Sequence, residues 1–258
     1  DEIRECIGCN ACYSRSVWGL HLGCTQNPTA GEEHRRGWHP ERFDKAANAA
    51  EPVLVVGAGS AGMECAMVLG KRGFDLVHLA DGGDDIGGQM RWVTRLPGLG
   101  EWGRVVDYRR VQLERLSTVE TVLETRLDAA AVREYGARIV VCATGARWTG
   151  DGMNGITRAP IPGADPSLPH VLLPEDVMVD GLRPLGRRVA IVDCEGYFTA
   201  AGLAEVLRGE GYEVTFVTPY DVVAPTCDQT LEGLRLRLHL HALGIDLRTA
   251  LTPAEILP

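Results

Sequence analysis

Four cysteines near the start of the chain follow the spacing C-x2-C-x2-C-x11-C, at Cys6, Cys9, Cys12 and Cys24. Three closely spaced thiolates can wrap one corner of a compact group, and the fourth returns after a short loop to close the cage. This pattern favours a [4Fe–4S] cluster, which takes one thiolate per iron. Zinc is the alternative, although its sites usually take well-separated C-x2-C pairs. A disulfide framework is less favoured, because the first three cysteines are too crowded to pair with one another.

The bulk properties of the chain limit its partners. It has 258 residues, enough for one large or two modest domains, and its formal net charge of -9 argues against nucleic acid. No apolar stretch approaches the ~20 residues that span a bilayer, and residues 1–5 do not resemble a signal peptide. We therefore expect a cytoplasmic protein without a nucleic-acid or membrane partner. Its remaining thiols should be buried and reduced. Because the chain has no initiator Met and enters the cysteine motif almost at once, we expect it to be part of a longer polypeptide.

The sequence pattern divides the chain into parts. Residues 1–45 have little periodicity and are expected to form a cluster-binding segment that its metal stabilises. Residues 45–51 read as a linker or helical lead-in. Residues 46–182 and 183–258 each contain a strand–turn–helix–strand pattern, which predicts an α/β fold with two Rossmann-like domains. We expect the second domain to be incomplete at residue 258, and not to bind a nucleotide.

A glycine-rich turn carries the prediction of nucleotide binding in the first of these domains. The apolar strand at residues 52–56 runs directly into a G-x-G-x-x-G sequence that opens a helix at residues 63–72, the context in which this motif is informative. Gly57 permits the tight turn, Gly59 lets a pyrophosphate approach the backbone, and Gly62 lets the helix pack on the strand. Ser60 and Ala61 lie at the helix start, where free N–H groups face the phosphates.

Further candidate residues follow along the same domain. Asp81 ends the second strand, 24 positions after Gly57, and is placed to accept hydrogen bonds from ribose hydroxyls. A glycine pair and a strand ending in Thr-Gly can bring more backbone near a dinucleotide. These segments add the candidates Gly88, Gln89, Thr144 and Gly145.

The corresponding turn of the second domain, at residues 193–198, has lost the glycine pattern. Asp193 and Glu195 stand where a pyrophosphate needs N–H donors, and like charge in such a crevice costs on the order of 1–3 kcal/mol. We predict that this domain keeps its fold but does not bind NAD(P)H.

Several long blocks of the sequence are similar to those of a known family. The blocks are residues 6–12, 24–27, 31–33, 35–41, 96–102, 143–148 and 161–165. They resemble the family of trimethylamine, dimethylamine and histamine dehydrogenases. The resemblance covers essentially the whole chain, although the loop before Cys24 has 11 residues where trimethylamine dehydrogenase has 12.

This resemblance implies a larger enzyme. An N-terminal barrel would carry covalent FMN and the amine pocket, and a [4Fe–4S] cluster would pass electrons to an electron-transferring flavoprotein. Two domains of the FAD/NAD(P)-disulfide-reductase type would follow, the first holding ADP, with FAD as the alternative. The four cysteines of the motif would ligate iron, and Gly57, Gly59, Gly62 and Asp81 would hold the nucleotide. We also expect a homo-oligomer, namely a dimer. The flavin-linking and amine-binding residues cannot be named from this chain.

Two other functions stay open. An NADPH-dependent 2,4-dienoyl-CoA or enoate reductase shares the architecture. Its third cluster cysteine typically follows three intervening residues rather than the two between Cys9 and Cys12, and the altered second turn also disfavours it. A stand-alone electron-transfer module is the other alternative, because this chain shows no substrate site. For Trp38 and His39 a structural role is favoured over packing near the cluster.

Overall fold

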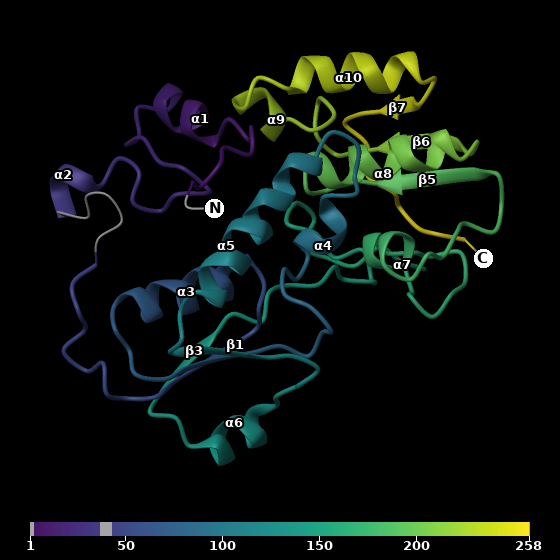
Figure 1. The fold of residues 1–258 in the computed structure, drawn as a ribbon. Coiled ribbons are helices and arrows are strands. Elements are labelled where there is room, and N and C mark those ends of the chain that lie inside the picture. Colours follow the sequence, from purple (N-terminus) through teal and green to yellow (C-terminus); the bar gives the residue numbers. More distant parts are fainter. Residues whose placement is uncertain (1–2, 37–42, 258) are drawn as a thin grey trace. The chain divides into compact units, whose positions relative to one another are not determined.

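The computed structural model describes residues 3–36 and 43–257 (Figure 1). Its contacts divide the chain into two compact units. The first unit contains the chain up to Cys12 together with His21–Thr94 and Leu99–Ala146, and the second contains Tyr13–Leu20, Arg95–Gly98 and Arg147 onwards. Each unit is described by itself.

The cysteine-rich segment has little regular structure. Its helices are α1 (Ala11–Val17) and α2 (Glu33–Arg36), and α1 buries none of its residues. The described part of residues 3–45 contains no strand. This agrees with the low periodicity of the sequence here.

A parallel sheet forms the centre of the first unit. Its strand order is β3-β2-β1-β4, and Val53 of β1 is paired with Val77 of β2 and with Ile139 of β4. The central strand β1 is almost fully buried, as its unbroken run of β-branched and aliphatic residues predicts for a strand covered on both faces. The strands are β1 (Val53–Val56), β2 (Val77–Ala80), β3 (Val119–Val122) and β4 (Ile139–Cys142).

Helices cover both faces of this sheet. In Figure 1, α3 and α5 lie on one face and α6 on the other. Met63 and Met67 of α3 are fully buried in the core. Asp128 caps α6 by accepting hydrogen bonds from the N–H groups of Ala130 and Ala131, at 2.9 and 2.8 Å. The helices are α3 (Ser60–Lys71), α4 (Met90–Val93), η1 (Gly100–Gly103), α5 (Arg104–Glu114) and α6 (Ala129–Tyr135).

Residues 45–51 do not form a free linker. Ala46 and Ala49 are buried in the core of the first unit. The N–H of Ala46 donates to the carbonyl of Arg72 at 2.9 Å, and the N–H of Asp75 donates to the carbonyl of Ala49 at the same distance. These contacts hold the segment against the C-terminal end of α3.

The second unit contains a smaller parallel sheet of order β5-β6-β7. Phe216 of β6 is fully buried, and α8 buries its alanine- and leucine-rich face. The elements are α7 (Pro174–Met178), β5 (Arg188–Val192), α8 (Phe198–Gly209), β6 (Glu213–Val217), α9 (Thr226–Gln229), α10 (Gly233–Ala242) and β7 (Asp246–Arg248).

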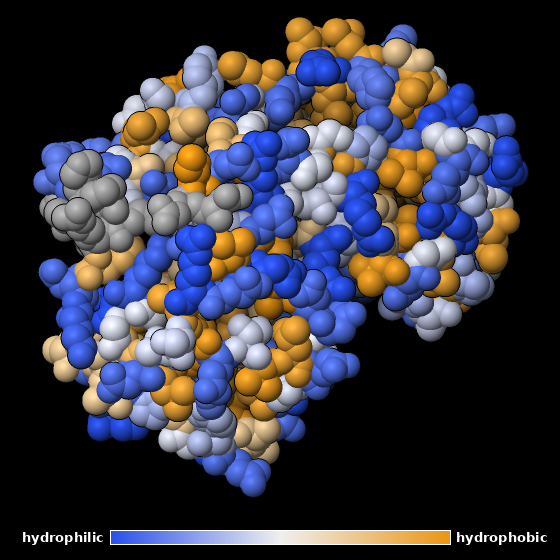
Figure 2. Space-filling model, in the orientation of Figure 1, coloured by the Kyte–Doolittle hydropathy of each residue, from blue (hydrophilic) through white to orange (hydrophobic). Residues whose placement is uncertain are grey.

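The surface drawn in Figure 2 is mostly hydrophilic, with hydrophobic residues gathered in separate patches. Leu234 and Leu238, four positions apart on α10, are both exposed. Across the described residues, every helix falls short of the length and apolar character needed to cross a membrane.

Candidate functional site

The glycine-rich turn between β1 and α3 is held by close backbone contacts. Gly57 adopts a left-handed conformation with φ of +104°, and a Cβ there would lie 2.3 Å from the carbonyl oxygen of Ala143. A Cβ on Gly62 would lie 1.8 Å from the carbonyl oxygen of Gly57. Only glycine fits these two positions, which agrees with the roles that the sequence predicts for them.

Gly59 differs from Gly57 and Gly62 because the space that a side chain would enter is open. No heavy atom lies within 4 Å of a Cβ built on this residue. Gly59 is the N-cap of the twelve-residue helix α3 and makes no side-chain capping hydrogen bond. The first N–H groups of a helix have no partner within the helix and favour negative charge, so the turn leaves room for an anion at this helix start.

Two further segments meet the glycine-rich turn. Gly88 has φ of +53°, and a Cβ on it would lie 3.0 Å from the Cα of Gly59. The N–H of Gly87 donates to the carbonyl of Ala58 at 2.8 Å. The side-chain amide of Gln89 donates to the carbonyl of Ala146 at 2.7 Å, which joins this loop to the segment after β4.

The predicted Thr-Gly segment after β4 lies in the same place. A Cβ on Gly57 would approach the Cα of Thr144 to 3.2 Å, and Gly145 (φ of +72°) has open space beside it. The structure therefore brings together the three stretches that the sequence singled out. They contain Gly57, Gly59, Ser60, Ala61, Gly62, Gly88, Gln89, Thr144 and Gly145.

Asp81 organises the turn from the end of β2. One carboxylate oxygen accepts a hydrogen bond from the N–H of Ala58 at 2.6 Å, and the other accepts from the N–H of Gly83 at 2.7 Å. The sequence predicted only a ribose acceptor. An ionised carboxylate has about four lone-pair sites, so two backbone bonds leave capacity for a ribose hydroxyl.

An ion pair missed by the sequence analysis fixes the loop that follows Asp81. Asp85 binds Arg110 of α5 through both oxygens, at 2.9 and 2.8 Å. The hydrogen bond from Arg110 lowers the pKa of Asp85. The pair connects the loop before Gly87 to a neighbouring helix.

The four cysteines of the N-terminal motif form no disulfide bond. Cys6 and Cys12 are exposed, whereas Cys9 and Cys24 are half-buried. The N–H of Gly8 donates to the Cys6 sulfur at 3.3 Å, and the Cys9 sulfur lies 3.0 Å from the Thr25 hydroxyl. Hydrogen bonds to sulfur are among the features that tune iron–sulfur clusters.

The structure does not draw these thiols into a ligand cage. In residues 3–36 and 43–257, no group of three or more His, Cys, Asp or Glu side chains is arranged to hold a metal ion. The donor set of four thiols in this spacing nevertheless suits an iron–sulfur cluster. The cluster stays a prediction, and Trp38 and His39 lie outside the described residues.

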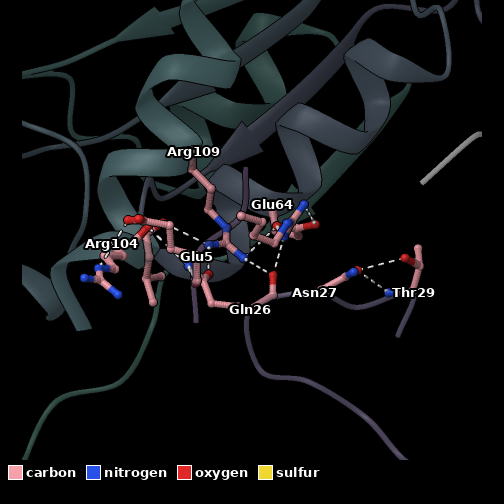
Figure 3. A network of polar contacts seen from close by, with 9 residues as sticks. Glu5, Gln26, Asn27, Thr29, Glu64, Arg104 and Arg109 are labelled. Carbon is pink, nitrogen blue, oxygen red and sulfur yellow. Dashed lines mark hydrogen bonds and ion pairs between the residues drawn. The ribbon is translucent and has the colours of Figure 1, made fainter. Parts of the chain in front are cut away.

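Within the first unit, a buried polar network joins the cysteine-rich segment to α3 and α5 (Figure 3). Arg109 of α5, only 3% exposed, contacts Glu64 of α3 at 2.7 Å and the side-chain oxygen of Gln26 at 2.7 Å. Arg4 contacts the same Glu64 at 3.0 Å, and its guanidinium lies 4.5 Å from the centre of the Tyr108 ring. We call Arg4, Gln26, Glu64 and Arg109 the Arg109 network.

The network holds both ends of the cysteine loop. Gln26, two residues after Cys24, donates from its side chain to the carbonyls of Glu5 and Arg104, at 3.4 and 3.3 Å. Arg104 in turn donates to the carbonyl of Cys6 at 2.9 Å. The chain before the first cysteine and after the last one is therefore anchored to α5.

The turn of the second unit is filled by its own side chains. Asp193, 2% exposed, accepts hydrogen bonds from the N–H groups of Glu195 and Gly196 at 3.0 and 3.1 Å. Glu195 accepts from the N–H of Thr199 in the first turn of α8 at 3.3 Å. The Tyr220 hydroxyl donates to the carbonyl of Cys194 at 3.1 Å. A protein carboxylate thus occupies the helix start, where a phosphate would need to bind.

Burial changes the acidity of this turn. It raises the pKa of Asp193, and the backbone hydrogen bonds from Gly196 and Glu195 oppose that effect only in part. The pKa of Glu195 is also raised, chiefly by burial and to a smaller extent by the charge of Asp193.

Comparison with protein families finds a match for the C-terminal part of the chain. Residues 172–256 match the family model described as the OYE-like second alpha/beta domain.

Individual relatives extend the comparison to nearly the whole chain. Dimethylamine dehydrogenase from Hyphomicrobium sp. (strain x) is 47% identical over 251 residues, which are 95% of this chain and 34% of that protein. The structure of 6-hydroxypseudooxynicotine amine oxidase (HisD) from Pseudomonas geniculata N1 is 43% identical with a TM-score of 0.93, covering 100% of this chain and 38% of that one. The histamine dehydrogenase structure from Rhizobium sp. 4-9 is 40% identical with a TM-score of 0.89, and the match covers 96% of this chain and 38% of that one.

These comparisons confirm the resemblance to the dimethylamine and histamine dehydrogenases. The chain spans roughly a third of the length of these relatives, so the similarity describes one part of such proteins.

The comparisons also correct the expected fold class. The α/β architecture with parallel sheets is present. However, the assignment to Rossmann-like domains of the FAD/NAD(P)-disulfide-reductase type is wrong, because the matches are to an OYE-like second domain and to amine-oxidising enzymes. The physical reason is that a strand–turn–helix–strand unit is shared by many α/β families. The local motif predicts the turn but not the family of the domain that contains it.

Two glycine substitutions should separate folding from binding at the turn. Alanine favours a helix over glycine by about 1 kcal/mol, but in Gly62→Ala the new methyl group meets the Gly57 carbonyl, so we expect a loss of unfolding free energy of several kcal/mol. In Gly59→Ala the new methyl group enters open space, so the free energy of unfolding should change by less than about 1 kcal/mol. Urea unfolding of both variants measures these free energies. Equal stability of the two variants would contradict the described turn.

Asp193→Asn should remove a pH-dependent loss of stability. The folded protein holds the Asp193 proton more tightly than the unfolded chain, because its pKa is raised. Wild-type stability therefore falls as pH rises from the ordinary aspartate value of about 3.9 through the raised pKa. The gain in unfolding free energy of Asp193→Asn over wild type should grow with pH across this window.

Denaturant unfolding at a series of pH values measures this gain. The control is Asp221→Asn, which changes an exposed aspartate of the same unit. A gain that does not change with pH, or that decreases as pH rises, would show that burial does not raise the pKa of Asp193.

Proposed function

We propose that the chain is part of an iron–sulfur flavoprotein amine dehydrogenase. Such an enzyme oxidises an amine, of the kind represented by trimethylamine, dimethylamine or histamine, at an FMN on an N-terminal barrel outside this chain. In this proposal the chain carries a [4Fe–4S] cluster and an ADP. The electrons leave to an electron-transferring flavoprotein, and the enzyme is a cytoplasmic homodimer.

The observation that carries the proposal is the contrast between the two turns. The Gly57–Gly62 turn, the Gly88–Gln89 loop and the Thr144–Gly145 segment meet beside the open helix start of α3. The second turn places Asp193 and Glu195 at the same position in its unit, and Glu195 already caps α8. This contrast supports one nucleotide in residues 46–182 and none in residues 183–258.

The contrast bears on the direction of electron flow. Without a nicotinamide site in residues 183–258, electrons have to enter from the flavin. The similarity to dimethylamine dehydrogenase and to the two amine-oxidising structures supports the same direction.

The residues of this chain have definite tasks in the proposed enzyme. Cys6, Cys9, Cys12 and Cys24 would hold the cluster, which supplies a one-electron relay when bound. The glycine-rich turn and the start of α3 would bind the pyrophosphate, and Asp81 would accept a ribose hydroxyl while it holds the turn through Ala58. The nucleotide would thereby stabilise the unit to which the cysteine loop is anchored.

The bound nucleotide tests the proposal. We expect denatured holoprotein to release ADP, identified by its mass, at about one per chain. Gly59→Ala should retain at least tenfold less ADP after gel filtration, because its methyl group fills the space beside the helix start, whereas its unfolding free energy stays close to wild type.

Release of FAD would instead favour the alternative, an NADPH-dependent dienoyl-CoA or enoate reductase. Anaerobic mixing with NADPH provides the matching control. No bleaching of a flavin or cluster band is expected, and rapid bleaching would contradict the closed second turn.

A further inference from the structure

The Arg109 network places charge in a poorly solvated position next to the cysteine loop. Arg109 is 3% exposed, and the side chains of Arg4 and Glu64 are 6% and 20% exposed. Glu64 is the carboxylate that both arginines contact. Charges at such depth are screened little by water or salt, so they act on neighbouring groups over longer distances than surface charges do.

The contacts of the network lead directly to the cysteine loop. Arg109 donates to the side-chain oxygen of Gln26 at 2.7 Å and to its carbonyl at 3.3 Å. Gln26 follows Cys24 by two positions, and Arg4 precedes Cys6 by two. In Figure 3, Arg109 and Glu64 reach from the two helices toward Gln26. The network is therefore attached to the first and the last cysteine through very short stretches of chain.

A charge near this loop would affect the reduction potential of a cluster bound there, in addition to any effect on folding. A cluster held by Cys6, Cys9, Cys12 and Cys24 would supply a one-electron relay from the flavin of the proposed enzyme, with no bond formed or broken in the protein. Its reduced form would carry one more negative charge than its oxidised form. A fixed positive charge nearby favours the reduced cluster, and a fixed negative charge disfavours it.

We propose that Arg109 is a positioning residue whose buried guanidinium raises the reduction potential of the cluster held by Cys6, Cys9, Cys12 and Cys24, with Glu64 acting in the opposite sense. This inference rests on the proposed function. It assigns to the Arg109 network the task of setting how readily the flavin delivers its electron.

The charge of Arg109 is suited to this task because it is permanent. Burial lowers its pKa, while the charge of Glu64 opposes that effect. A guanidinium starts so far above neutrality that it remains protonated in proteins. The potential should accordingly be raised across the whole physiological pH range.

Substitutions of opposite sign give the test. Potentiometric titration of the anaerobic holoprotein, followed by the electron paramagnetic resonance signal of the reduced cluster, measures the potential. Arg109→Met should lower the ratio of reduced to oxidised cluster at a fixed potential on the order of tenfold, about 59 mV for a one-electron couple. Glu64→Gln should move the potential upward. Arg109→Lys keeps the charge and should stay close to wild type.

The opposite directions distinguish this inference from a purely structural role. The inference requires Arg109→Met and Glu64→Gln to shift the reduction potential in opposite directions. A shift in the same direction in both variants, or no shift in either, would indicate that the network only shapes the loop and would overturn the inference. The control is Arg115→Met, which removes an exposed charge near the end of the same helix and should have little effect. If Arg115→Met shifted the reduction potential as much as Arg109→Met does, the inference would also be overturned. If Arg109→Met does not fold, Glu64→Gln against Arg115→Met still decides the sign.

Failure of the proposed function gives a different result. If wild-type holoprotein shows no signal of a reduced cluster, both the cluster in the proposed function and this inference are contradicted. A wild-type signal with a reduction potential that does not change in Arg109→Met or Glu64→Gln would contradict this inference but not the proposed function.

Discussion

The contact between Arg109 and Gln26 is the interaction on which this account of the chain depends. The cysteine-rich segment has little regular structure, its helix α1 buries none of its residues, and two of its four thiols are exposed. The buried guanidinium supplies the anchor, because a buried charge needs partners and finds them in Gln26 and Glu64. Loss of one partner would leave the other polar groups buried and unsatisfied, so the arrangement is specific as well as stabilising.

The two parallel-sheet units show how one local architecture can be open or closed to an anion. In the first unit, glycines clear the space at the start of α3 and Asp81 holds the turn from behind. In the second unit, Glu195 satisfies the start of α8 and Tyr220 closes the loop over Cys194. The N–H groups at a helix start therefore bond to a side chain in the second unit, whereas in the first unit they are open to the proposed ligand. Function has to be argued from the turn residues rather than from the fold.

Local sequence signals predicted much of this structure because they reflect short-range physics. The apolar strands, the glycine-rich turn and the acidic second turn all follow from residues that lie close together in the chain. The Arg109 network could not be predicted in this way, since Arg109 and Gln26 are 83 positions apart. The second task of Asp81 was missed for a related reason, because the sequence does not show which backbone N–H groups point at a carboxylate. The family of the domain was predicted wrongly, because a motif shared by many α/β families does not distinguish among them.

The proposed function depends most on the cysteine motif, and one measurement tests the assignment of that motif directly. Iron and acid-labile sulfide should be determined in holoprotein purified without oxygen, with zinc measured in the same sample. The account predicts about four iron atoms and about four sulfides per chain, with negligible zinc. Stoichiometric zinc, or neither iron nor sulfide, would contradict it.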